Sequence, residues 1–264
     1  MENWLAVIAA LFYLGCLATI IPGLLHQEGI SKKNVLVSIA IALFSHAALL
    51  SHDILQGNGQ DFSILNVASL MSFIIALVMS IAMFKTRLWF LLPIVYSFAA
   101  INALASTFIN GHFITHLENS PEVLVHISLA LFAYATLTIG ALYALQLAWL
   151  DKKLKEKKAL AINPNLPPLL TIERQLFNII AMGTGLLTVT LLTGFIFVGD
   201  MFAEGKAHKA IFSIIAWIIY VISLWGHYQK GWRGRKITWF AVAGAGLLTL
   251  AYFGSRFVKE VILG

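Results

Sequence analysis

The chain has 264 residues, of which 59% are hydrophobic and 11% are charged, and its formal net charge is +6. Soluble domains carry about 25% charged residues, so this composition excludes a soluble enzyme, a disulfide-stapled secreted domain and a disordered chain. It predicts a polytopic membrane protein whose first partner is the lipid bilayer. We interpret the positive charge as a mark of loop topology and expect no binding to nucleic acid.

Eight apolar runs are long enough to cross a bilayer as helices, which satisfy their own backbone hydrogen bonds in lipid. They cover residues 4–25, 34–55, 62–84, 88–109, 121–150, 175–198, 209–228 and 237–257. None shows the alternation of a barrel strand. We therefore predict an all-α, polytopic transmembrane helical bundle of about eight spans, which forms a single integral membrane domain over residues 1–264. The first run has no basic segment before it, so we expect an uncleaved span.

Loop charges give the expected orientation. Fourteen of the 18 lysines and arginines lie in the loops that follow the first, third, fifth and seventh runs. Because basic residues collect in cytoplasmic loops, we expect both termini on the outer, periplasmic side of a bacterial inner membrane. Segment 151–174 is then a cytoplasmic loop between spans five and six. Its lysines, from Lys152 to Lys158, are expected to extend the fifth helix beyond the bilayer and to act as a stop signal beside anionic lipid. The alternative is a docking surface for a soluble or membrane protein partner.

The spans lack the residues that membrane catalysis and ion coupling need. No span has Asp, Glu, Lys or Arg near its centre, which counts against an ion-coupled transporter. The sequence has no nucleophile–base set, no HExxH motif and no phosphate-binding glycine loop. Cys16 is the only cysteine, so there is no internal disulfide and no CxxCH haem-attachment motif. We expect the protein not to be an enzyme.

Eight histidines are the informative polar residues, because a neutral imidazole ligates haem iron or a divalent metal. His52, His116 and His126 lie at or near the expected outer boundary of the membrane. His46 lies in mid-span, about 18 Å along a helix from Asn34. Beside the ligand role, each boundary histidine can also be an interfacial polar residue, and His46 can also be a hydrogen-bonded structural residue. His46 and His52 do not share a face of a helix with about 3.6 residues per turn.

The pair His112 and His116 has the i,i+4 spacing of a helical zinc motif, but Asn110-Gly111 indicates a loop there. We therefore expect no metal site beyond haem iron.

Two stretches resemble the cytochrome c assembly family, the CcsA-type haem-handling membrane proteins. Residues 121–150 carry the first set of motif residues, which are His126, Tyr134, Gly140 and Tyr143. The second stretch starts at Pro167-Pro168 and includes Gly231-Trp232-Arg233-Gly234-Arg235 and Tyr252-Phe253-Gly254. With its short length and eight runs, the chain most resembles the short YpjD/HemX-like inner-membrane branch of this family.

The resemblance implies a protein that binds or handles haem through histidine ligands for cytochrome c maturation. His126 corresponds to the family's first outer haem-ligand histidine and His46 to its transmembrane histidine. His116 and His52 complete the candidate cofactor-binding set, with Lys206, Lys209, Arg256 and Lys259 as candidates for the haem propionates. Haem-binding members carry a tryptophan-rich outer loop, whereas residues 199–208 contain no tryptophan.

Two alternatives stay open. One is a HemX-like regulatory or scaffolding membrane protein that acts without haem transfer, with segment 151–174 docking its partner. The other, less favoured, is a metal or small-solute transporter.

Overall fold

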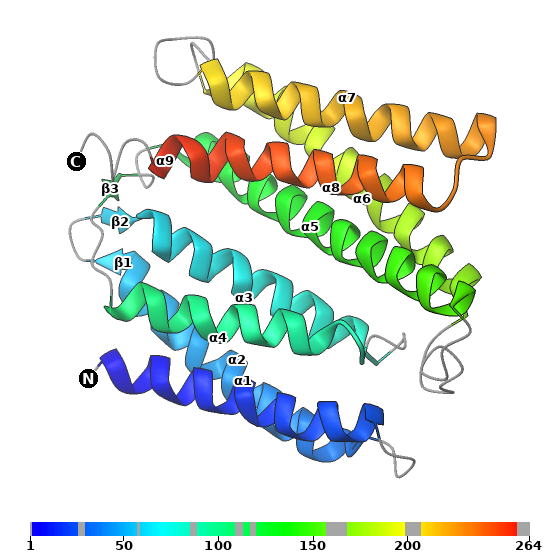
Figure 1. Cartoon of the computed structure of the whole chain (residues 1–264). Helices are drawn as coiled ribbons and strands as arrows, with labels where there is room; N and C mark the ends of the chain where they lie inside the picture. Colours follow the sequence, from blue (N-terminus) through cyan, green and yellow to red (C-terminus); the bar gives the residue numbers. More distant parts are fainter. Residues whose placement is uncertain are drawn as a thin grey trace. The chain divides into compact units, whose positions relative to one another are not determined.

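The computed structural model describes residues 2–25, 30–56, 59–84, 89–108, 113–116, 120–156, 168–198 and 207–257. Long helices account for most of them (Figure 1). Their bounds are α1 Glu2–Leu25, α2 Lys32–Ile54, α3 Ile64–Ala82, α4 Leu92–Phe108, α5 Pro121–Lys155, α6 Leu169–Phe197, α7 Ala207–Lys230 and α8 Arg235–Thr249. A π-helical turn, Leu250–Gly254, and the short α9, Ser255–Phe257, continue α8.

The predicted all-α polytopic fold is confirmed. Seven helical segments are long and apolar enough to cross a membrane. α4 is the shorter eighth, because its 17 residues rise about 26 Å against a hydrocarbon core of about 30 Å. The expected extension of the fifth helix is also present, since α5 continues to Lys155. α6 begins at Leu169, six residues before the apolar run, directly after Pro168.

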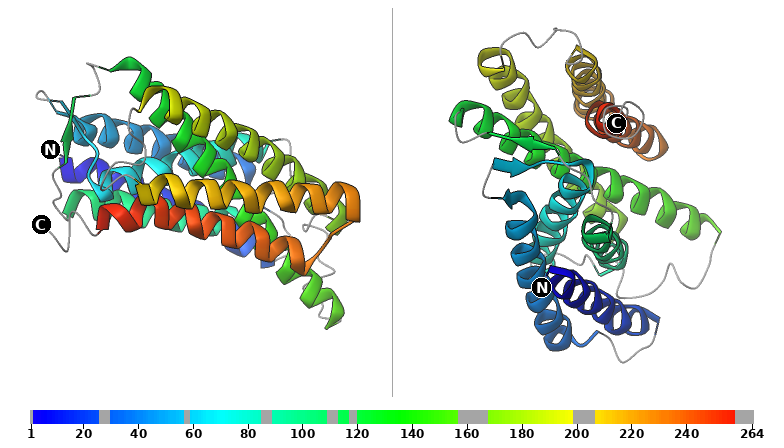
Figure 2. Two further views of the ribbon diagram at one scale, coloured as in Figure 1. Left: turned by 90° about the horizontal axis from the view of Figure 1, so that it is seen from above. Right: turned by 90° about the vertical axis from the view of Figure 1, so that its left-hand side faces the viewer.

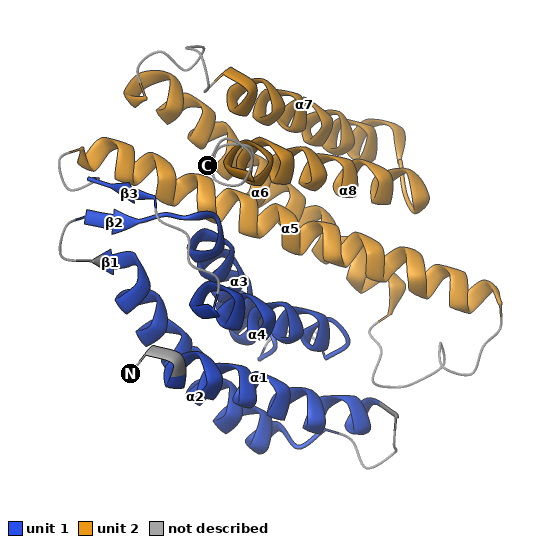
Figure 3. Cartoon of the chain, turned by 60° about the vertical axis from the view of Figure 1, so that its left-hand side comes forward, with its two compact units in different colours: residues 1–116 blue, residues 117–264 orange. Residues whose placement is uncertain are grey.

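The chain divides into two compact units, residues Met1–His116 and Leu117–Gly264 (Figure 3). In the first unit α1 packs against α2 and α4, and α3 packs against α4 and α2. In the second unit α5 packs against α6 and α8, and α7 packs against α8 and α6. Figure 2 shows α7 and α8 side by side and joined by a short turn.

A small antiparallel sheet closes one end of the first unit, where α2 ends and α3 begins. Its strands are β1 Leu55–Gln56, β2 Gly59–Asp61 and β3 Ile114–Thr115, in the order β1-β2-β3. The buried Asp61 joins the segment before α3 to the segment before β3. Its Oδ1 accepts the backbone N–H of Ser63 at 3.0 Å and that of Phe113 at 2.9 Å. The apolar-run pattern predicted no sheet here.

Glycines allow close helix contacts in the second unit, as expected for helices that associate in lipid. A Cβ added at Gly183 of α6 would lie 2.6 Å from a side-chain carbon of Leu137 on α5. One added at Gly244 of α8 would lie 2.6 Å from the ring of Tyr220 on α7. Tyr220 also donates to the carbonyl of Ala241 at 3.2 Å. Each pair therefore fixes the separation of two helices.

Candidate functional site

His46 is the hydrogen-bonding centre of the first unit. Its side chain on α2 is 0% exposed. Nδ1 lies 3.1 Å from the hydroxyl of Tyr13 on α1, and Nε2 lies 2.9 Å from the hydroxyl of Ser69 on α3. The ring also meets the edge of Phe73, with centroids 5.4 Å apart. Since both ring nitrogens are hydrogen-bonded, the imidazole joins α1, α2 and α3. For the ring to coordinate iron, one of its two partners, Tyr13 or Ser69, would have to be displaced.

The polar contacts continue from Tyr13 toward α4. The ring of Tyr13 stacks on that of Tyr96, with centroids 5.7 Å apart. The hydroxyl of Tyr96 lies 2.9 Å from that of Ser80 on α3. All of these side chains are buried. The first unit therefore contains a buried set of hydroxyl and imidazole groups contributed by all four of its long helices.

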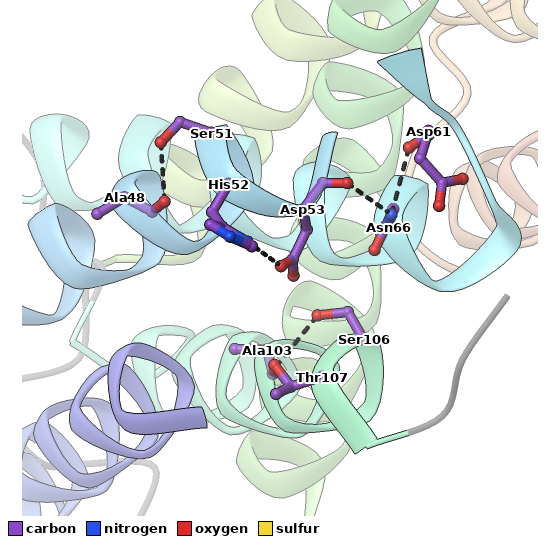
Figure 4. Close-up of polar contacts among 9 residues, drawn as sticks. All are labelled: Ala48, Ser51, His52, Asp53, Asp61, Asn66, Ala103, Ser106 and Thr107. Carbon is purple, nitrogen blue, oxygen red and sulfur yellow. Dashed lines mark hydrogen bonds and ion pairs between the residues drawn. The ribbon is translucent and has the colours of Figure 1, made fainter. Parts of the chain in front are cut away.

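His52 lies at the sheet end of α2, and its environment differs from that of His46. Its side chain is exposed, and Nδ1 lies 3.4 Å from Oδ1 of Asp53 (Figure 4). Beside it, the side-chain amide of Asn66 donates to the carbonyls of Asp53 at 3.4 Å and Asp61 at 3.3 Å. These contacts fasten the end of α2 to β2 and α3. His46 and His52 therefore belong to separate environments, as their spacing predicted.

His116 follows β3 at the same end of the first unit and is exposed. Its Cε1 lies 3.1 Å from the position of a Cβ added at Gly59. Gly59 has a φ of +127°, which favours glycine. The ring of His116 therefore covers the backbone of β2. Among the residues that the structure describes, no three His, Cys, Asp or Glu side chains come together as a metal site.

His126 lies in the second unit, near the start of α5, and its ring is half-buried. Nδ1 lies 3.2 Å from the hydroxyl oxygen of Thr193 on α6. That hydroxyl lies 2.9 Å from the carbonyl of Val189 and 3.0 Å from that of Thr190, so its hydrogen is directed to the backbone. It therefore accepts from Nδ1–H of His126. In the neutral ring the lone pair is then on Nε2, the nitrogen that a metal ion would bind.

The Tyr252-Phe253-Gly254 motif forms the π-helical turn that continues α8. Such turns are rare and are frequent at functional sites. Just before the turn, the hydroxyl of Thr249 lies 2.9 Å from that of Tyr134 on α5, whose ring also contacts Phe253. This pairing joins the two motif stretches that the resemblance identified.

Two cations meet the ring of Tyr252 in this turn. The ammonium of Lys209 lies 5.5 Å from the ring centroid, and the guanidinium carbon of the buried Arg256 lies 5.8 Å from it. Both are at the end of the second unit where α5 begins, and therefore at the same end as His126 (Figure 1). Two of the expected propionate-binding candidates are thus brought to one aromatic ring.

The Gly231-Trp232-Arg233-Gly234-Arg235 motif forms the turn between α7 and α8, at the opposite end of this unit. Nδ1 of His227 donates to the carbonyl of Trp232 at 3.1 Å, and the His227 ring stacks on Phe177 with an interplanar angle of 13°. Arg233 Nε lies 2.9 Å from a carboxylate oxygen of Glu173 on α6. This motif therefore connects α7 to α8 and anchors the turn to α6.

Several predicted features lie outside the described residues. They are His112, Lys206, Lys259, residues 157–167 of segment 151–174 and residues 199–206 of the loop that lacks tryptophan.

The sequence did not reveal the partners of the two candidate histidines, which are Tyr13, Ser69 and Thr193. A signal existed for Tyr13, because a tyrosine in the middle of an apolar run needs a hydrogen-bond partner for its hydroxyl. Serine and threonine gave no comparable signal, since in helices they also bond to their own backbone.

Comparisons with known proteins agree with the resemblance. The family model described as cytochrome C assembly protein matches residues 34–263. The inner membrane protein YpjD of Escherichia coli (strain K12) is 51% identical over 259 residues, which cover 97% of this chain and 98% of that protein. The cytochrome c biogenesis protein CcsA of Chlamydomonas reinhardtii is 26% identical over 142 residues, which cover 52% of this chain and 38% of that protein.

No solved structure matches the chain. The family match spans both compact units and includes His46 and His126. The chain is therefore a membrane protein of the cytochrome c assembly family.

Proposed function

We propose that this protein is a non-enzymatic inner-membrane protein that handles haem through histidine ligands during cytochrome c maturation. The observation that carries the proposal is the hydrogen bond from His126 to Thr193, which directs the lone pair of the ring to Nε2. Family membership supports it, as does the likeness to proteins named for cytochrome c biogenesis. The inner-membrane assignment rests on the name of the E. coli relative.

The residues at the α5 start of the second unit fit haem chemically. His126 would hold the iron through Nε2, while Thr193 fixes the orientation of the ring. Lys209 and Arg256 carry the positive charge that propionate carboxylates need. A bound haem would supply an iron centre capable of one-electron exchange and ligand exchange. The role of the chain is to bind and orient that group in the membrane.

His46 is the second proposed ligand, and it differs from His126 in the hydrogen bonding of its ring nitrogens. Both of its ring nitrogens have partners, so a haem in the first unit would have to replace Tyr13 or Ser69. Ser69 is the easier partner to lose, because a serine hydroxyl on a helix can turn to its own backbone carbonyls. His52 and His116 are exposed at the sheet end of the first unit. They are proposed as further contacts for haem.

The absence of catalysis is also part of the proposal. The side chains that join the helices are hydroxyls, aromatic rings and two histidines. The hydroxyl of Ser69 lies 2.9 Å from Nε2 of His46, within the distance of a nucleophile from its base. Both side chains are 0% exposed, so a substrate could not reach this pair. We therefore expect no turnover by the protein alone.

A regulatory or scaffolding role without haem transfer is the second candidate. It is favoured by the saturated hydrogen bonds of His46, which suit a structural residue. The solvent-exposed Lys152 and Lys155 at the end of α5 would then form part of a partner-binding surface in segment 151–174.

Titration of the purified protein with ferric haem tests the proposal. Wild-type protein should bind haem saturably, with a Soret band that His126→Gln weakens or shifts. His227→Gln is a matched control, because glutamine can still donate to the carbonyl of Trp232. Absence of saturable binding by the wild type, or equal effects of both substitutions, would support the scaffolding candidate instead.

A further inference from the structure

The turn between α7 and α8 is held rigidly by its own contacts. Gly231 and Gly234 have φ values of +65° and +62°, which favour glycine. The backbone N–H of Trp232 donates to the carbonyl of Gly226 at 3.0 Å. The Trp232 ring covers Gly226 so closely that no Cβ fits there. With the ion pair between Arg233 and Glu173, these contacts fix the turn against both α7 and α6.

Three cations of this turn face outward. Lys230, Arg235 and Lys236 are all exposed. The ammonium of Lys230 lies 5.7 Å from the ring centroid of Trp225, and that of Lys236 lies 5.3 Å from the ring centroid of Trp232. Lysine and tryptophan are the residues that gather at the level of lipid headgroups. The pairing of each amine with a tryptophan ring therefore favours a place for both amines at headgroup level, where phosphates lie.

Other lysines at this end of the second unit have acidic partners. Lys155 lies 2.6 Å from an oxygen of Asp151, and Lys152 and Lys153 lie 4.0 and 3.9 Å from the carboxylate of Glu156. Within the described part of the chain, Lys230, Arg235 and Lys236 have no acidic side chain within ion-pair distance. Among the described residues, this surface therefore carries three charges that no acidic side chain balances.

An apolar track on α7 leads away from these cations. Its members are 40% to 53% exposed and are spaced three or four residues apart, so they line one face of the helix. They are Ile211, Ile215, Ile218, Ile222 and Trp225. From Ile215 to Trp225 the helix rises about 15 Å, which is half of a hydrocarbon core of about 30 Å. The track is therefore long enough to cover one acyl chain of one leaflet.

We propose that the α7–α8 turn and this track bind an anionic phospholipid. Its phosphate contacts Lys230, Arg235 and Lys236, and an acyl chain lies along α7 from Trp225 toward Ile211. A zwitterionic lipid suits the surface less well, because its own ammonium competes for the phosphate that the three cations need. This site is independent of haem, since none of its residues belongs to the proposed haem contacts.

Thermal unfolding of the detergent-solubilised protein with added lipid tests this site. Phosphatidylglycerol should raise the midpoint of the wild type by several degrees more than phosphatidylcholine does. Combining Lys230→Gln, Arg235→Gln and Lys236→Gln should remove that difference. The matched control combines Lys152→Gln, Lys153→Gln and Lys155→Gln, which removes the same amount of charge and should keep the difference. Equal stabilisation of the wild type by both lipids, or an equal loss in the control, would overturn the proposal.

Fluorescence gives a second test that does not require the charge variants to fold. Phosphatidylglycerol brominated on its acyl chains should quench the tryptophan emission of the wild type more steeply than brominated phosphatidylcholine. Trp225→Phe should remove most of this difference, whereas Trp149→Phe, on α5, should retain it. Identical quenching by the two lipids in the wild type would overturn the proposal.

Discussion

The hydroxyl of Tyr13 lies 3.1 Å from Nδ1 of His46 and joins α1 to α2 inside the first unit. With Ser69 on the other ring nitrogen, this contact gives the most buried histidine of the candidate set a defined orientation. The same imidazole that resembles a transmembrane haem ligand thus also holds three helices together. If His46 has a structural role, loss of Tyr13 or Ser69 should lower the stability of the protein. If His46 binds iron, one of these two partners must be displaced.

Tyr13→Phe is expected to lower the free energy of unfolding of the haem-free protein. The substitution keeps the ring and removes one interhelical hydrogen bond, which in membrane proteins contributes about 0.6 kcal/mol on average and up to about 1.7 kcal/mol. Ser69→Ala should have an effect of similar size. Chemical unfolding in detergent measures both. Ser51→Ala, at an exposed hydroxyl that bonds to its own helix at Ala48, is the control; a loss there as large as in the other two would contradict a specific role for the His46 contacts.

Two glycines of α8 should respond oppositely to alanine. At Gly244 a Cβ would lie 2.6 Å from the ring of Tyr220, so Gly244→Ala should cost about 1–3 kcal/mol through overpacking. At Gly246 no atom lies within 4 Å of an added Cβ, so Gly246→Ala should be neutral or stabilising because alanine is the better helix former. Unfolding midpoints of the two variants provide the comparison. If Gly244→Ala unfolds at the same midpoint as the wild type, α7 and α8 are not packed as closely as the Gly244–Tyr220 contact indicates.

Asp61→Ala should loosen the sheet end of the first unit. The carboxylate accepts two backbone N–H groups, from Ser63 and Phe113, and leaving buried donors without an acceptor costs about 1–3 kcal/mol. Hydrogen exchange at the amides of β2 and β3 should accelerate more than exchange in α1. Asp151→Ala, which removes an exposed ion pair with Lys155, should change stability by less than about 1 kcal/mol. Unchanged exchange in β2 and β3 would refute the role given to Asp61.

The orientation of the chain is predicted from its loop charges. A reporter fused after Gly264 should be active in the periplasm, and one inserted beside Lys155 should be active in the cytoplasm. The reason is that fourteen of the 18 basic residues lie in the loops assigned to the inner side. Alkaline phosphatase and green fluorescent protein fusions make the measurement. Cytoplasmic activity at Gly264 would mean that the number of spans or their direction is different.

Most of the helical fold could be predicted from apolar runs, because lipid imposes long apolar segments on every span. The apolar run begins six residues after the start of α6, because Glu173 and Arg174 interrupt the apolar pattern although they continue the helix. The sheet could not be predicted, since β2 and β3 are short and pair across more than 50 residues. The partners of His46 lie 33 and 23 residues away along the chain, so only the packing of the helices reveals them.

The haem content of the protein purified from membranes tests the central claim most directly. Our account predicts that the wild type retains haem, with a Soret band that shifts on reduction by dithionite. It predicts that His126→Gln retains less haem or shows a shifted band, because the imidazole that would hold the iron is lost, while His227→Gln matches the wild type. Wild-type protein that is free of haem when haem is plentiful, or the same spectrum in all three proteins, would contradict the account.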